Sequence, residues 1–130
     1  MVPVACTDAG RGGGCRCGAV RFVATGRPNW VAWCHCESCR RATGAPVAAY
    51  AGFPADAVRF PAEPPIEFAS SPGVRRGFCS RCGSPLTFTG ERWPGEIHLH
   101  LGSFDDPADL VPTTEAYAEE RLPWVHLSLP

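Results

Sequence analysis

The sequence lacks any long apolar run and any segment that looks like a secretion signal. Nowhere in its 130 residues does an apolar run approach the roughly 18 residues of a membrane-spanning helix. Residues 1–15 contain neither a basic region nor an apolar region, the two parts of a secretory signal. We therefore expect neither a membrane protein nor a secreted precursor, and we expect a cytoplasmic location.

Lysine is absent, and all twelve basic residues are arginine. Together with 13 acidic residues they give a formal charge of −1 and a sequence pI of about 6.4. A nucleic-acid-binding domain usually has a denser basic stripe and a pI above about 9. We therefore expect no nucleic-acid partner. Arginine without lysine, with much alanine, glycine and proline, is typical of a high-GC bacterial genome.

The chain is long enough for one domain with a modest core. Glycine and proline are abundant, at 14 each, but 45% hydrophobic and 10% aromatic residues favour a packed, loop-rich fold. Residues 1–12 show no periodicity and are expected to form a flexible leader, with a single domain over 13–130.

Short apolar runs separated by proline and glycine predict a mainly β fold of antiparallel sheets, with at most short helices. The expected strands are 19–23, 30–33, 47–53, 57–60, 66–69, 74–78, 86–89 and 96–101. In the last of these, alternation places Ile97, Leu99 and Leu101 on the core side, with His98 and His100 on the other. The clearest helix signal covers 105–110, where Asp residues precede and follow Pro107.

The eight cysteines are the strongest chemical signal. Seven of them form three clusters: Cys15 and Cys17; Cys34, Cys36 and Cys39; and Cys79 and Cys82. Close cysteine pairs deliver two thiolates from one tight turn to a zinc ion, which takes four ligands in a closed structural site. Cys6 stands alone and is expected to be a free thiol.

Counting ligands divides the clustered thiols into two sites. The outer pairs, Cys15 and Cys17 with Cys79 and Cys82, make a complete four-thiolate structural site. The central triplet is left with three ligands, which is typical of a catalytic zinc with one open position. The alternative is that this site also closes. Its fourth protein ligand would then be Cys6 or one of His35, His98, His100 and His126.

Glycines flank the cysteine pairs. Gly18 and Gly83 directly follow a cysteine and are expected to adopt the positive φ values that turn backbone N–H groups toward sulfur. Gly12, Gly13 and Gly14 precede the first pair and fit either such a turn or a flexible loop. His35, between two cysteines, is expected to point away from the metal.

The motifs resemble one family. They are 13–22 around the first cysteine pair, 34–40 around the triplet, 76–84 around the last pair, 102–107, and Pro123 with Trp124. Together they resemble the glutathione-dependent formaldehyde-activating enzymes, also called GFA or CENP-V/GFA domains. Three cysteine clusters in this order are a specific signal.

The resemblance implies an Mss4-like fold and two zinc ions. The structural zinc falls on Cys15, Cys17, Cys79 and Cys82, and the catalytic zinc on Cys34, Cys36 and Cys39. It also implies a carbon–sulfur lyase activity that joins formaldehyde to glutathione as S-hydroxymethylglutathione. Many relatives carry a His where this chain has 112–115, Pro-Thr-Thr-Glu, and this departure leaves the substrate open.

We expect the partners to be a small thiol and an aldehyde, with arginines binding the carboxylates of glutathione. The candidates are Arg40 and Arg41, next to the triplet, and Arg75 and Arg76, before the last pair. Two alternatives stay open: a non-catalytic zinc module that binds glutathione or a protein, and a lyase for another thiol adduct.

Overall fold

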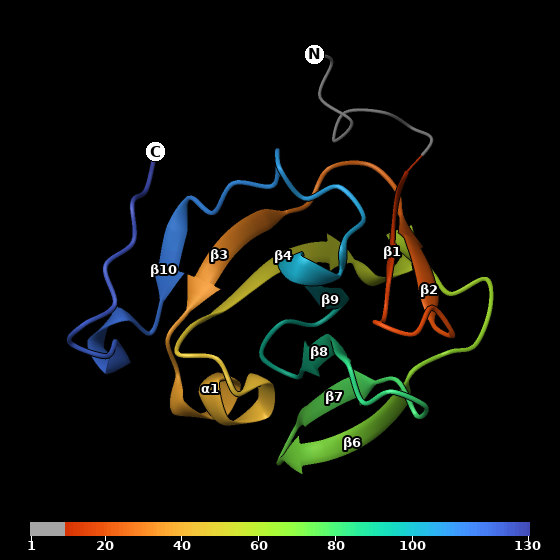
Figure 1. Cartoon of the computed structure of the whole chain (residues 1–130), viewed down its shortest axis with the longest axis horizontal. Helices are drawn as coiled ribbons and strands as arrows, with labels where there is room; N and C mark the ends of the chain where they lie inside the picture. Colours follow the sequence, from red (N-terminus) through yellow and green to blue (C-terminus); the bar gives the residue numbers. More distant parts are fainter. Residues whose placement is uncertain (1–9) are drawn as a thin grey trace.

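The computed structural model describes residues 10–130. Two sheets make up the fold (Figure 1). The smaller sheet has the order β1-β2-β5, from Arg11–Gly14, Arg21–Ala24 and Val58–Arg59. No helix within these residues has the length and apolar character needed to cross a membrane.

The larger sheet has seven strands in the order β10-β3-β4-β9-β8-β7-β6. Its strands are β3 Trp30–Cys34, β4 Ala48–Pro54, β6 Ile66–Ser71, β7 Val74–Phe78, β8 Pro85–Gly90, β9 Glu96–His100 and β10 Thr114–Ala116. Every neighbouring pair is antiparallel except β10 with β3, which is parallel. The mainly β, antiparallel prediction is therefore confirmed. Each expected strand is present with boundaries within two residues of those expected, whereas β1 and β10 were not predicted.

One face of the large sheet packs on the small sheet through the main core. The core contains fully buried apolar residues from both sheets, among them Val20, Phe22, Phe53, Leu86 and Leu99. Leu99 and Leu101 lie in this core and Ile97 packs against it, as the alternation of β9 predicts. The opposite face carries a smaller apolar cluster that includes Cys34, Cys39, Tyr50 and Phe88.

The α-helix α1, Glu37–Thr43, was not predicted. Its N-cap is Cys36, whose thiol accepts a hydrogen bond from the N–H of Cys39, and its C-cap is Gly44 at φ 72°. The cap is a thiol rather than the usual Ser, Thr, Asp or Asn, so the customary start signal is missing. In Figure 1, α1 follows the carboxyl end of β3 and lies across from β6 and β7.

The predicted helix over 105–110 is wrong, because this segment forms bends and turns. Tertiary contacts occupy the groups that would begin a helix. The Asp105 carboxylate pairs with Arg21, and the Arg11 guanidinium binds both the Asp106 carbonyl, at 3.2 Å, and Asp109, at 2.6 Å. These contacts tie the segment to β1 and β2.

Within residues 10–130 the chain also forms the short 3₁₀ helices η2 Ala55–Ala57, η3 Leu101–Ser103 and η4 Ala118–Glu120. Residues 1–9 of the expected leader, 1–12, lie outside the described residues, and Cys6 is among them. Arg11 and Gly12, the last residues of that segment, belong to β1. Gly13 packs so closely on Phe22 that a Cβ there would collide with the ring, so close packing explains this glycine.

Candidate functional site

The outer cysteine pairs meet, as the ligand count predicts. The Sγ atoms of Cys15, Cys17, Cys79 and Cys82 all lie within 4.8 Å of one another. Both turns direct N–H groups at sulfur: Val20 donates to Cys15 at 3.3 Å, and Arg81 donates to Cys79 at 3.3 Å. Gly18 and Gly83 have φ of 86° and 78°, which confirms their expected conformation.

Ser84 joins the two turns of this four-thiol cluster. Its hydroxyl accepts a hydrogen bond from the Arg16 N–H at 3.0 Å and lies 3.1 Å from the Cys82 sulfur. Hydrogen bonds from the Ser84 side chain and backbone lower the pKa of the Cys82 thiol to about 5. Four sulfurs at this spacing, with N–H donors around them, fit a closed tetrahedral zinc site.

The central triplet forms a second cluster on the other side of the large sheet. Cys34 ends β3, Cys36 caps α1 and Cys39 lies inside α1, and their Sγ atoms lie within 4.8 Å of one another. Among residues 10–130, no further His, Cys, Asp or Glu joins this group. Within this range three protein ligands are therefore available, and none of His35, His98, His100 and His126 closes the site; Cys6, the other candidate for a fourth ligand, lies outside the described residues.

The acid–base properties of the triplet fit a bound cation. Hydrogen bonds from the Cys34 and Cys36 thiols lower the pKa of Cys39, and Tyr50 and Arg76 lower it further, against the effect of burial. The same contacts with its neighbours raise the pKa of Cys34. One thiol therefore ionises easily, whereas three adjacent thiolates need the compensating charge of a metal ion.

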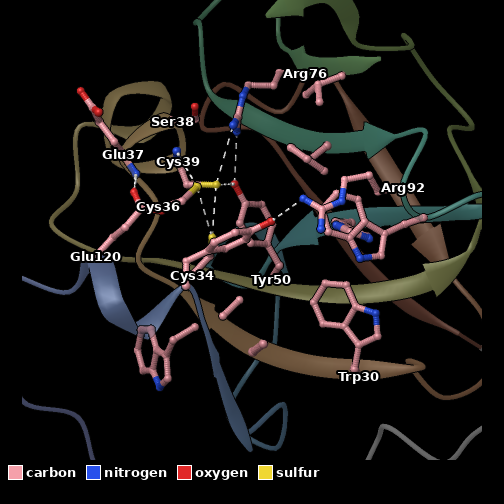
Figure 2. A pocket seen from close by; sticks show the side chains of 18 of the residues that line it. Trp30, Cys34, Cys36, Glu37, Ser38, Cys39, Tyr50, Arg76, Arg92 and Glu120 are labelled. Atoms are coloured by element: carbon pink, nitrogen blue, oxygen red, sulfur yellow. Dashed lines mark hydrogen bonds between the residues drawn. The ribbon is translucent and has the colours of Figure 1, made fainter. Parts of the chain in front are cut away.

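A cavity of about 570 Å³ opens beside the triplet. Its walls come from β3, α1, β4, β7, β8, β9 and β10, and the turn between β8 and β9 contributes Arg92 and Trp93. Figure 2 shows the three sulfurs at one side of this space, with Tyr50 next to them. An open metal position here has room for a small-molecule ligand.

Tyr50 and Arg76 surround the Cys39 sulfur. The Tyr50 hydroxyl donates to Cys39 Sγ at 3.3 Å, and Arg76 donates to the Tyr50 oxygen at 3.4 Å and to Cys39 Sγ at 3.7 Å (Figure 2). Burial raises the pKa of Tyr50, so its hydroxyl keeps its proton. Sequence analysis missed Tyr50, because only the fold brings β4 against α1.

The four arginine candidates have different positions. Only Arg76 lines the cavity. Arg41 and Arg75 are exposed and paired with Glu37 and Glu67, while Arg40 does not line the cavity. Arg92, which was not predicted, lines it, and its guanidinium donates to the Tyr117 hydroxyl at 3.1 Å.

Arg76 and Arg92 share a second property. Among the described residues, neither guanidinium pairs with a carboxylate, in contrast to Arg41 and Arg75. Because no carboxylate of the described residues neutralises them, both charges can attract an anionic ligand into the cavity.

The histidines are placed as polar residues rather than ligands. His35 is fully buried and points to Glu115, which confirms that it turns away from the triplet. His98 lines the cavity, and its Nε2 lies 3.0 Å from Glu96. Burial lowers the pKa of both His98 and His100, the latter to about 4, so both rings are neutral at pH 7.

Comparisons with known proteins match most of this chain. A sequence model of the glutathione-dependent formaldehyde-activating enzyme family matches residues 11–120, a span that contains all seven clustered cysteines. A Halomonas elongata protein, provisionally named a glutathione-dependent formaldehyde-activating enzyme, is 34% identical over 127 residues. That match covers 88% of this chain and 79% of the relative.

A crystal structure of a Rhodobacter sphaeroides protein has a similar fold. The TM-score is 0.64 with 22% sequence identity, and the match covers 81% of this chain and 99% of that one. This likeness concerns the fold alone. The sequence matches identify the family: the chain belongs to the glutathione-dependent formaldehyde-activating enzyme family.

Proposed function

We propose that the chain is a zinc-dependent carbon–sulfur lyase that forms and splits adducts of glutathione with a small aldehyde. The observation that carries this proposal is the triplet of Cys34, Cys36 and Cys39, which has no fourth ligand among the described residues and opens into a cavity. The family supplies formaldehyde and glutathione as the expected substrates.

In this proposal the triplet holds the catalytic zinc, and Cys15, Cys17, Cys79 and Cys82 hold the structural zinc. When bound at the triplet, zinc lowers the pKa of an incoming thiol so that it becomes a nucleophile at neutral pH. Three thiolate ligands make the metal a weak Lewis acid, which favours activation of a thiol over hydrolysis.

The reaction forms one carbon–sulfur bond, moves one proton from sulfur to oxygen and needs no redox partner. The glutathione sulfur attacks the carbonyl carbon, a carbon–sulfur bond forms, the π electrons move to oxygen, and the proton lost by the thiol ends on that oxygen. Arg76 and the Tyr50 hydroxyl lie beside the Cys39 sulfur, where their hydrogen-bond donors can stabilise the developing negative oxygen.

Two further observations support the proposal: the charge of the cavity and the number of reduced thiols. Arg76 and Arg92 have no carboxylate partner among residues 10–130, and the carboxylates of glutathione would provide one. Seven free thiols in two clusters must stay reduced to bind metal, which agrees with a cytoplasmic location.

Rates of adduct exchange test the function directly. Because the adduct also forms without a catalyst, exchange between formaldehyde and its glutathione adduct is followed by NMR with zinc-loaded protein, and the uncatalysed rate is subtracted. We expect a rate increase that Cys36→Ser abolishes, while Cys36→Ser keeps the structural zinc and the native circular dichroism spectrum. A rate equal to the uncatalysed one would favour the alternative, a non-catalytic zinc module that binds thiols.

A further inference from the structure

The cavity is also lined by a group of rings to which the proposed reaction with formaldehyde assigns no role. We define the aromatic wall as Trp30, Phe88, Trp93 and His98, all of which line the cavity. His98 is the centre of this group: it stacks on Phe88 at 5.3 Å with an interplanar angle of 14°, and it meets Trp30 edge-on at 4.5 Å. Figure 2 shows Trp30 on the side of Tyr50 away from the three cysteines.

The size and chemistry of this space exceed what a one-carbon aldehyde requires. The cavity of about 570 Å³ lies within the range of about 300–1,000 Å³ that holds drug-sized ligands. Glutathione itself is a tripeptide with two carboxylates, and these suit the arginines rather than the rings. The aromatic wall is left to contact an apolar part of the ligand.

Two arginines restrict the charge of the ligand group that can lie against the aromatic wall. The Arg76 guanidinium lies 4.9 Å from the centroid of Phe88, and the Arg92 guanidinium lies 5.5 Å from that of Trp93. Aromatic cages bind cationic ligands through ring faces, but here protein cations already lie over two of the rings. A further cation would be repelled, whereas a neutral planar group can pack edge-on or offset against the rings.

We propose that the site prefers a glutathione adduct whose aldehyde-derived group is aromatic, and that the aromatic wall determines this preference. The inference rests on the proposed function and specifies its substrate class. The chemistry is the same addition: the thiol sulfur bonds to the carbonyl carbon of an aromatic aldehyde, and the thiol proton ends on the carbonyl oxygen. The aryl group of the adduct then lies against Trp93 and Phe88.

Stable thioethers test the preference without turnover. Binding of S-benzylglutathione and S-methylglutathione to the zinc-loaded full chain is measured by calorimetry, with phenylmethanethiol and ethanethiol as ligands that lack the peptide. We expect S-benzylglutathione to bind at least about tenfold more tightly than S-methylglutathione. Trp93→Ala should remove most of this ratio. Trp124→Ala, at an exposed tryptophan outside the cavity, should retain it.

The outcomes separate this inference from the proposed function. Equal binding of the two thioethers would overturn the aromatic preference and leave the glutathione function standing, and this comparison needs no variant to fold. Tighter binding of phenylmethanethiol than of ethanethiol, with neither thioether bound, would support the aromatic wall and contradict glutathione as co-substrate. An unchanged ratio in Trp93→Ala would overturn the assignment to the wall.

Discussion

The Nε2 atom of His35 lies 2.7 Å from Oε1 of Glu115, which ties the segment between two triplet cysteines to β10. The same segment is held by the backbone, where the His35 N–H donates to the Ala116 carbonyl at 3.0 Å. Thr114 and Ala116 line the cavity and Glu115 does not. Glu115 therefore supports the triplet from behind instead of facing the cavity.

Removing this support should destabilise the protein. We expect Glu115→Ala to lower the free energy of unfolding by about 2 kcal/mol, because it leaves the fully buried His35 ring without its partner. Glu115→Gln, which retains an acceptor oxygen, should recover part of the loss. Glu119→Ala is the control, since Glu119 is exposed on the same segment. Thermal unfolding of the three zinc-loaded variants measures the effect, and equal loss in Glu115→Ala and Glu119→Ala would contradict it.

Arg76 and Arg75 are neighbours in the sequence, but we expect only the substitution of Arg76 to change the kinetics. Arg76→Met should raise the KM for glutathione about tenfold, as expected for the loss of a charge-assisted hydrogen bond, and should also lower kcat because Arg76 contacts the Cys39 sulfur. Arg92→Met should raise KM alone. Arg75→Met should change neither, because Arg75 is exposed and paired with Glu67. Steady-state kinetics with varied glutathione separates the three, and a KM effect of Arg75→Met as large as that of Arg76→Met would refute the assignment.

His100 should remain neutral in moderately acidic solution. Burial lowers its pKa from 6.5 to about 4 in the folded protein, whereas the unfolded chain takes up the proton near pH 6.5. Stability is therefore complete above pH 6.5 and falls as the pH drops from 6.5 toward 4, by up to about 3 kcal/mol from this residue. NMR titration of the imidazole signals, with His100→Gln to assign them, should find the His100 signal unmoved down to pH 5. A midpoint near pH 6.5 would contradict its burial.

Arg11 should contribute strongly to stability, because it ties β1 to the segment 105–110. Its side chain is 3% exposed and pairs with Asp109 at 2.6 Å. Arg11→Met removes this charge-assisted contact and the hydrogen bond to the Asp106 carbonyl from a buried position, so we expect a loss of about 3 kcal/mol. Arg27→Met, at an exposed arginine, is the matched control. Denaturant unfolding of both variants with zinc bound measures the difference, and a loss below about 0.5 kcal/mol for Arg11→Met would contradict the account.

Local patterns predicted the strands other than β1 and β10, because alternation is a property of short segments. The grouping of the clustered cysteines into two sites followed from counting the ligands that a closed zinc site needs. The contacts of Tyr50, Arg92 and Glu115 with other parts of the site could not be predicted. These three side chains come from β4, from the turn between β8 and β9, and from β10. The order of strands in the sheet brings them to the site, and spacing along the sequence does not show that order. The missed helix α1 has a thiol cap, and the wrong helix at 105–110 was overridden by Arg11 and Arg21. In both cases a specific side chain decided the local conformation.

The central claim is that one metal site is closed and the other accepts a thiol. X-ray absorption at the zinc edge counts sulfur ligands on the zinc-loaded protein before and after glutathione is added. We expect one zinc ion bound by four protein sulfurs and a second bound by three. When glutathione binds, the second zinc ion should gain one sulfur ligand, and this gain should be absent in Cys36→Ser. A sulfur count that glutathione leaves unchanged in the wild-type protein would contradict the open site and the catalytic function built on it.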